Sequence, residues 1–291
     1  MMKFEGIMPA LVTPLTENED LNVPVLQQLL EHLLAQGAHG FYVGGATGEC
    51  IALKESVRRQ LAEETVKTVN HRVPCILHIA ATDLHQAVAL AKQAEACGAD
   101  GISAIPPLFF KYDQEDVFSY YKKLADAVSI PLMVYYNPNA GFAINAEFAA
   151  RLFTIDNVTA IKWTSSDYYG MMRLKDLTHG EMNIINGPDE MLLMGLSAGA
   201  DGGIGTTYNL MLPRFLEIYR QFKQNNVHAA HQVQMETDRI IEALLRYATI
   251  PATKAVLEHQ GFAVGNACFP MKRYNDAEKR TIYQALCEAG L

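Results

Sequence analysis

Short apolar segments alternate with longer amphipathic segments along the first three quarters of the chain. The apolar runs have the length of strands, and the segments between them carry apolar residues at helical spacing. The predicted strands are Ile7–Val12, Gly40–Val43, Cys75–Ile79, Gly101–Ile105, Pro131–Tyr135, Val158–Lys162, Met182–Ile185 and Gly202–Ile204. The predicted helices include Val23–Gln36, Lys54–Asn70, Leu84–Ala96 and Asp113–Ala127.

This alternation predicts an α/β fold with a parallel sheet, and eight strands predict a closed (β/α)8 TIM barrel. A doubly wound open sheet is the alternative, but its glycine-rich dinucleotide fingerprint is missing after the first strand, where Met8–Thr13 stands. The pattern predicts one domain over residues 1–291. Within it, residues from about 209 to 291 form the last barrel helix and an added layer of C-terminal helices.

A glycine-rich fragment recurs at Gly37–Gly40, Gly98–Gly101 and Gly199–Gly202. Each copy follows a predicted helix and precedes a predicted strand. A glycine that closes a helix before a tight turn explains this placement. The recurrence therefore indicates one βα unit used repeatedly.

Composition narrows the class of protein. A hydrophobic share of 49% and a charged share of 19% are typical of a soluble globular chain, and a net charge of -8 argues against a nucleic-acid partner. No apolar run is long enough for a membrane span, and the start lacks a signal-peptide pattern. The five cysteines are scattered without disulfide or metal spacing, so we expect a cytoplasmic protein.

Lys162 ends the sixth predicted strand, where a buried strand normally stays apolar. Burying an unpaired ammonium is costly, so such a lysine tends to lose its proton and become a nucleophile. A neutral amine can attack a ketone and form a Schiff base. The alternative is that Lys162 lies just beyond the strand and extends to solvent.

The active site of such a barrel lies at the C-terminal ends of its strands. After the second strand, Gly44–Glu49 offers backbone amides and the Thr47 hydroxyl to an anion such as a carboxylate. Tyr135, at the end of the fifth strand, offers a phenol for proton transfer. A plain turn and a packed tyrosine are the ordinary explanations of these two features.

Two further strand ends are polar. Asp189 and Glu190 follow the seventh strand, where they form either a solvated first helical turn or a polyol site. Gly205–Asn209, after the eighth strand, is rich in hydroxyl groups. The histidines do not cluster at metal spacing, and we interpret His78 as a core residue, so we expect no metal.

Five motifs in this order, GGATGE, YYNP, AIKWT, NGPDE and GADGGIGTTYN, resemble those of the N-acetylneuraminate lyase and dihydrodipicolinate synthase superfamily. These proteins are class I pyruvate aldolases, and the resemblance covers nearly the whole chain. The last two motifs are closest to the lyase branch. The resemblance implies a Schiff base on Lys162, proton transfer by Tyr135 and carboxylate binding by Thr47 and its neighbouring amides. It also implies a homotetramer and no metal or organic cofactor.

The resemblance further implies which residues bind the sugar-derived part of the substrate: Thr164, Gly187, Asp189, Glu190 and Thr206. Three positions depart from the family pattern. Ala46, in the substrate-binding turn, stands where the lyases carry serine or threonine, and Phe109 stands where a neighbouring subunit contributes a tyrosine. Asn139-Ala140 replaces the arginine that the synthase branch uses for its amino-acid substrate.

The sequence therefore predicts an aldolase that cleaves N-acetylneuraminate, or a related 2-keto-3-deoxy sugar acid, to pyruvate and an aldehyde. One alternative is a synthase-like condensation of pyruvate with an aldehyde. Another is a sensor that binds a 2-keto acid without turnover.

Overall fold

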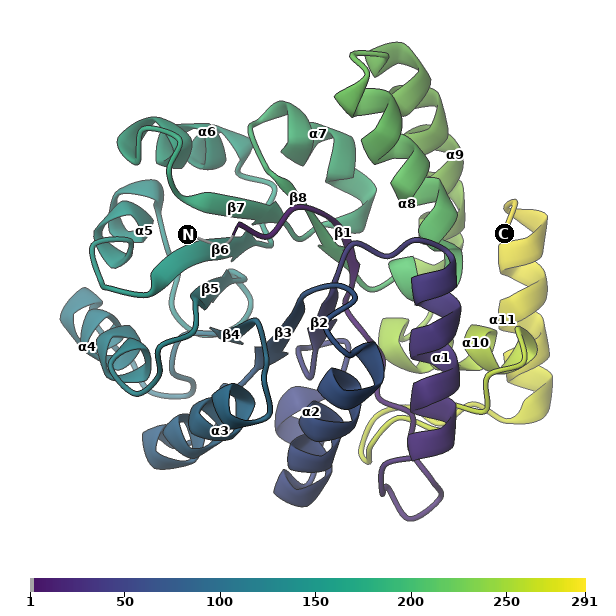
Figure 1. The fold of residues 1–291 in the computed structure, drawn as a ribbon. Coiled ribbons are helices and arrows are strands. Elements are labelled where there is room, and N and C mark those ends of the chain that lie inside the picture. The colour runs from purple at the N-terminus through teal and green to yellow at the C-terminus, as the bar shows by residue number, and fades with distance from the viewer. Residues whose placement is uncertain (1–2) are drawn as a thin grey trace.

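The computed structural model describes residues 3–291, which form eight parallel strands arranged as a nearly closed barrel inside a ring of helices (Figure 1). The strands are β1 Gly6–Pro9, β2 Phe41–Val43, β3 Cys75–His78, β4 Gly101–Ala104, β5 Leu132–Tyr136, β6 Val158–Trp163, β7 Asn183–Asn186 and β8 Gly202–Gly205. Their order is β1-β8-β7-β6-β5-β4-β3-β2. The predicted TIM barrel is confirmed.

The barrel closes between β1 and β2 through a short contact. A parallel bridge joins Ala10 to Tyr42, and the Leu11 amide donates to the Tyr42 carbonyl at 2.9 Å. The first strand was predicted to run to Val12, but it ends at Pro9. The residues that follow turn from β8 towards β2, and this turn closes the barrel.

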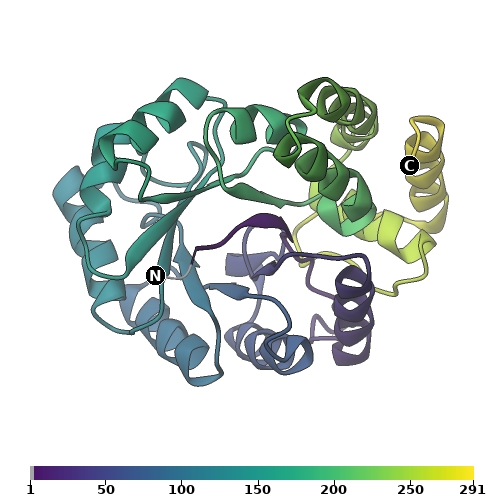
Figure 2. The ribbon, with the colours of Figure 1, turned by 45° about the horizontal axis from the view of Figure 1, so that its top comes forward.

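Eleven α-helices alternate with or follow the strands in the described chain. They are α1 Val23–Ala35, α2 Glu55–Val69, α3 Leu84–Ala96, α4 Gln114–Ala125, α5 Ala146–Leu152, α6 Tyr168–Leu177, α7 Leu192–Ser197, α8 Tyr208–Lys223, α9 Val227–Leu245, α10 Thr249–His259 and α11 Asp276–Glu288. The last three lie beside α8 and α1, on one flank of the barrel (Figures 1 and 2). Within residues 3–291, no helix is both long and apolar enough to cross a membrane.

The recurring fragment closes three helices in the same way. Gly37, Gly98 and Gly199 have φ of +95°, +89° and +101°, a left-handed conformation that glycine adopts without a steric penalty. The alanine after each glycine donates its amide to the carbonyl five residues earlier, at 3.1, 3.0 and 2.9 Å. This bond defines a Schellman cap, so the predicted helix-to-strand turn is confirmed.

The third residue of each fragment ties its turn to a neighbouring strand. His39 accepts the Ile7 amide at 2.9 Å through Nδ1. Asp100 accepts the Cys75 amide at 2.8 Å, and Asp201 accepts the Ile184 amide at 2.9 Å. Each bond satisfies a backbone donor near the start of a buried strand. The fragment therefore fixes strand position as well as helix termination.

Candidate active site

Lys162 lies inside β6, one residue before the strand ends at Trp163, and its side chain is buried. Its Nζ atom is 4.4 Å from the centre of the Tyr135 ring and 4.6 Å from the centre of the Tyr42 ring. Among the described residues, no carboxylate lies within ion-pair distance of this amine. The alternative in which Lys162 extends to solvent is therefore wrong, because the strand carries the side chain into the barrel.

Tyr135 lies directly beside Lys162, because the two residues pair in the register of β5 and β6. Paired residues on neighbouring strands point to the same side of a sheet. Tyr135 is buried, and its ring meets those of Tyr42 and His78 edge-on, at centre distances of 6.0 and 5.8 Å. The barrel thus brings a phenol and an amine from different strands together.

A cavity of about 430 Å³ opens above these strands. Thr164 and Asn137, two residues beyond Lys162 and Tyr135, are part of its wall, whereas Lys162 and Tyr135 are buried below. The ends of β7 and β8 and the helices α9 and α10 supply other parts. The wall includes Asn137, Pro138, Asn139, Thr164, Ser165, Ser166, Gly187, Pro188, Asp189, Glu190, Met191, Thr206, Thr207, Ile241, Leu244, Leu245 and Thr249.

The turn after β2 is joined to the end of β8. The Thr47 and Thr206 hydroxyl oxygens are 2.6 Å apart, although the two residues are far apart in sequence. Gly44 has φ +66°, a conformation that explains a glycine at the start of the turn. Thr47 is buried, while Ala46 is exposed. The predicted carboxylate turn therefore reaches the cavity through Thr206.

Asp189 joins the ends of β7 and β8 through hydrogen bonds. Its Oδ2 atom accepts the Thr207 amide at 2.7 Å and the Thr207 hydroxyl at 2.6 Å. Burial raises the pKa of Asp189 to about 6, despite these hydrogen bonds, which favour the charged form. One carboxylate oxygen is thus already engaged by the protein, whereas Glu190 is exposed at the cavity wall.

Thr164 and Gly187 meet closely at the ends of β6 and β7. A Cβ atom on Gly187 would lie 2.0 Å from the Thr164 hydroxyl oxygen and 2.7 Å from the Thr164 Cα atom. Only glycine fits against this backbone. Among the described residues, the buried Thr164 hydroxyl has no hydrogen-bond partner, and Thr164 is part of the cavity wall.

Sequence reasoning missed part of this cavity. Ile241, Leu244 and Leu245 supply an apolar wall from α9, and Thr249 begins α10. Apolar residues at helical spacing give no signal that separates a cavity wall from a core. Tyr42 was also missed, although a phenol inside a short buried strand is a detectable signal.

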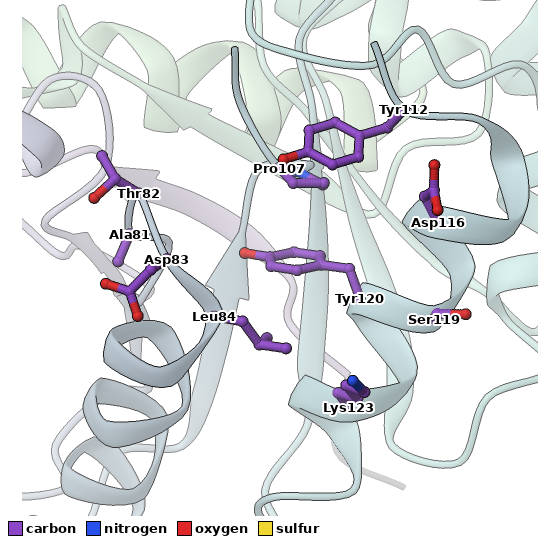
Figure 3. Close-up of a pocket in the computed structure, with 10 residues that line it drawn as sticks. All are labelled: Ala81, Thr82, Asp83, Leu84, Pro107, Tyr112, Asp116, Ser119, Tyr120 and Lys123. Carbon is purple, nitrogen blue, oxygen red and sulfur yellow. The ribbon is translucent and has the colours of Figure 1, made fainter. Parts of the chain in front are cut away.

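A second cavity, of about 260 Å³, lies between the start of α3 and α4 (Figure 3). Figure 3 shows Leu84 on α3 facing Tyr120 on α4, with Tyr112 above them. None of its lining residues is shared with the cavity above Lys162.

Within residues 3–291, no group of histidine, cysteine or acidic residues is arranged to hold a metal. The buried amine, its paired phenol and the polar cavity beyond them place the candidate active site at Lys162.

Comparison with known proteins agrees with this geometry. Residues 3–289 match the dihydrodipicolinate synthetase family. The chain belongs to this family. It is 32% identical to N-acetylneuraminate lyase 2 of Escherichia coli O6:H1 over 268 residues, which are 91% of this chain and 88% of that protein. It is 33% identical to N-acetylneuraminate lyase of Citrobacter koseri over 258 residues, which are 88% and 86% of the two chains.

A solved structure is similar over the whole fold. CdNal from Clostridium difficile, crystallised in complex with mannosamine, superposes with a TM-score of 0.94 at 29% identity, covering 99% of this chain and 100% of that one. Family membership makes this protein a class I pyruvate aldolase, a lyase. The family forms a covalent Schiff base between a lysine and pyruvate and needs no external cofactor.

Proposed function

We propose that this aldolase cleaves N-acetylneuraminate, or a related 2-keto-3-deoxy sugar acid, to pyruvate and an aldehyde. The observation that carries the proposal is the position of Lys162. Its buried amine lies against two tyrosine rings, below a cavity lined by hydroxyl and carboxylate groups. An amine in this position suits imine formation, and the polar wall suits a polyol chain.

In the proposed reaction, the Lys162 amine attacks the C2 ketone and water leaves as the imine forms. The protonated imine accepts the electron pair of the C3–C4 bond when that bond breaks. Tyr135, paired with Lys162 across β5 and β6, receives the C4 hydroxyl proton as the aldehyde forms. Protonation of the resulting enamine at C3, followed by hydrolysis, releases pyruvate and restores the amine.

The substrate is oriented by the two ends of the site. In this proposal Thr47 and the amides of its turn bind the carboxylate, with Ala46 beside them. Thr164, Gly187, Asp189, Glu190 and Thr206 bind the polyol chain, and Asp189 also holds the wall in place through Thr207. The apolar α9 wall of Ile241, Leu244 and Leu245 suits an acyl substituent on the aldehyde.

Synthase-like condensation of pyruvate with an amino-acid aldehyde is the second candidate, because the matching family is named for dihydrodipicolinate synthetase. Asn139 and Ala140 supply no positive charge for such a substrate. The similarity to several N-acetylneuraminate lyases further supports the proposal that this enzyme cleaves a sugar acid.

The test is a panel of 2-keto sugar acids assayed for pyruvate release, with aspartate semialdehyde and pyruvate as the synthase arm. We expect release from N-acetylneuraminate or a close analogue, and a borohydride-stable pyruvate adduct on Lys162. Lys162→Arg should give neither, because a guanidinium stays protonated and cannot attack a ketone. Condensation without cleavage would favour the synthase. Binding of pyruvate without any turnover would favour a sensor.

We also propose that the enzyme is a cytoplasmic homotetramer. Phe109 and Phe110 are 94% and 69% exposed on the β4–α4 loop, and Phe109 has φ +78°. Large aromatic residues held outward in this way suit a subunit contact. Light scattering should give a mass four times that of the 32.2 kDa chain. A monomer at working concentration would contradict this assembly.

A further inference from the structure

Three polar side chains form a hydrogen-bonded chain inside the barrel, next to Lys162. The Tyr42 hydroxyl on β2 donates to the Ser103 hydroxyl oxygen on β4 at 3.0 Å. The same Tyr42 oxygen lies 3.0 Å from Nδ1 of His78 on β3. All three residues are buried. The chain therefore links three neighbouring strands at the level of the amine.

The number of protons that these three side chains carry determines which group donates each hydrogen bond. Burial lowers the pKa of His78 well below its usual value, and the nearby Arg58 and Lys162 charges act in the same direction. A neutral imidazole carries one proton. Tyr42 donates its only proton to Ser103, so its oxygen is an acceptor for the His78 tautomer that carries the proton on Nδ1. The Tyr42 oxygen thus has two partners, which fix the orientation of its ring.

Packing holds the ring as well. A Cβ atom on Gly45 would lie 2.3 Å from the Tyr42 ring, so the glycine lets the turn close over it. The Tyr42 ring also meets the Tyr135 ring edge-on, with an angle of 84° between their planes. Hydrogen bonds and packing together leave Tyr42 little freedom to move away from Lys162.

The face of this fixed ring lies 4.6 Å from Nζ of Lys162, and the Tyr135 ring lies 4.4 Å away. A cation within about 6 Å of an aromatic ring centre is attracted by the ring. In the function proposed above, Nζ carries positive charge when the imine is protonated. Since the described residues place no carboxylate beside Nζ, the two rings are its nearest electrostatic support.

We propose that Tyr42 is a positioning residue of the Schiff-base site. Its ring, anchored by His78 and Ser103, holds Nζ of Lys162 beside Tyr135 and stabilises the protonated imine. This inference rests on the proposed function, in which Lys162 forms that imine. Tyr42 keeps its proton throughout, because burial raises its pKa well above the usual value.

The test measures how fast borohydride traps the pyruvate adduct on the intact protein, alongside kcat and KM for cleavage. Tyr42→Phe keeps the ring and removes its anchor, whereas Tyr42→Leu removes the ring. We expect trapping to slow by about 10-fold for phenylalanine and about 100-fold for leucine, because small misplacements of reacting groups have effects of this size. The kcat value should fall more than KM rises.

Two comparisons separate positioning from general destabilisation. His78→Asn keeps an amide donor near Nδ1 and should retain more activity than His78→Leu. Tyr121→Phe is the matched control, because Tyr121 is also fully buried and donates to the Ala104 carbonyl at 3.0 Å, but from α4. This control should trap pyruvate at the wild-type rate.

The outcomes distinguish this inference from the proposed function. Failure of the wild-type protein to trap pyruvate overturns both. Normal trapping by the wild type and by Tyr42→Phe, with only a lower melting temperature, leaves the function intact and overturns the positioning role. If Tyr42→Leu does not fold, Tyr42→Phe and the His78 pair still decide the question.

Discussion

The Glu49 carboxylate and the Lys254 ammonium meet at 2.6 Å, with side chains 0% and 2% exposed. Glu49 ends the turn that carries Thr47, and its other oxygen accepts the Cys268 amide at 2.6 Å. Lys254, on α10, also donates to the Asn266 carbonyl at 2.9 Å. The added C-terminal helices therefore anchor the turn that we assign to carboxylate binding.

Removing Lys254 should damage both stability and substrate binding. Lys254→Met leaves a buried carboxylate unpaired, which typically lowers the free energy of unfolding by about 3–5 kcal/mol. Loosening of the turn should also raise KM for every 2-keto acid. Urea unfolding and steady-state kinetics check the two effects.

A double variant and a control complete this experiment. Lys254→Met with Glu49→Gln should recover much of the lost stability, because no unpaired charge remains. Lys279→Met removes the partly exposed Lys279–Glu258 pair of the same region and should cost about 1 kcal/mol or less. Equal losses for Lys254→Met and Lys279→Met would show that the buried pair is not an anchor.

Thr206→Ala should discriminate between long and short substrates. Loss of one hydrogen bond typically costs about 0.5–1.5 kcal/mol, so KM for a nine-carbon sugar acid should rise by about 2- to 13-fold. If the substitution acts through Thr47, KM for a short 2-keto acid should rise by the same factor as KM for the long substrate. The ratio of the two increases in KM therefore measures the contact between Thr206 and the polyol chain. Thr154→Ala, at an exposed turn position just beyond α5, is the control. An unchanged ratio would place the polyol elsewhere.

Asp189 should make stability depend on pH in a definite direction. Its pKa of about 6 in the folded state lies above the ordinary value of 3.8. Between these values the folded protein holds a proton that the unfolded chain has lost. The stabilising contribution is therefore complete below pH 3.8 and is lost as the pH rises through about 6.

Asp189→Asn should remove this dependence, so the variant gains stability relative to wild type between pH 4.5 and pH 7. Urea unfolding at both pH values measures the difference. Asp238 also contributes stability that falls as the pH rises, since burial raises its pKa to about 6. His39 and His78 have lowered pKa values, so their contributions to stability rise with pH. These groups contribute equally to Asp189→Asn and to wild type, so they cancel in the difference between the two free energies of unfolding. A constant difference at both pH values would contradict the raised pKa of Asp189.

The replaced hydroxyls at Ala46 and Phe109 should act together. General acid–base catalysis is typically worth about 10²–10⁴-fold, and a proton relay supplies part of that. Phe109→Tyr alone should change the turnover number little, since the new hydroxyl lacks a partner. Ala46→Ser with Phe109→Tyr should exceed the product of the single effects, because hydrogen-bond networks act as units.

Turnover of the four forms on N-acetylneuraminate measures this coupling. Additive single effects, or a folded double variant no faster than wild type, would show that the enzyme uses another proton path. In that case Ala46 is better explained as space for a different substrate.

Much of the fold could be predicted from local patterns in the sequence. Alternating apolar and amphipathic segments were enough to predict the barrel, because each strand and helix follows from a periodicity within its own residues. The Gly37, Gly98 and Gly199 turns were also predictable, since a helix cap depends on adjacent backbone alone. Lys162 stood out because a charge inside an apolar strand conflicts with its neighbours.

Only the tertiary structure decided what surrounds that lysine. Closure of the barrel brings the Tyr42 and Tyr135 rings, which meet edge-on, to the same amine. It also joins Thr47 to Thr206 across a long stretch of sequence. The engagement of Asp189 with Thr207 likewise depends on how two strand ends meet. Such contacts depend on the register and curvature of the closed sheet, which no single segment contains, because they arise only when all the strands pack around one interior.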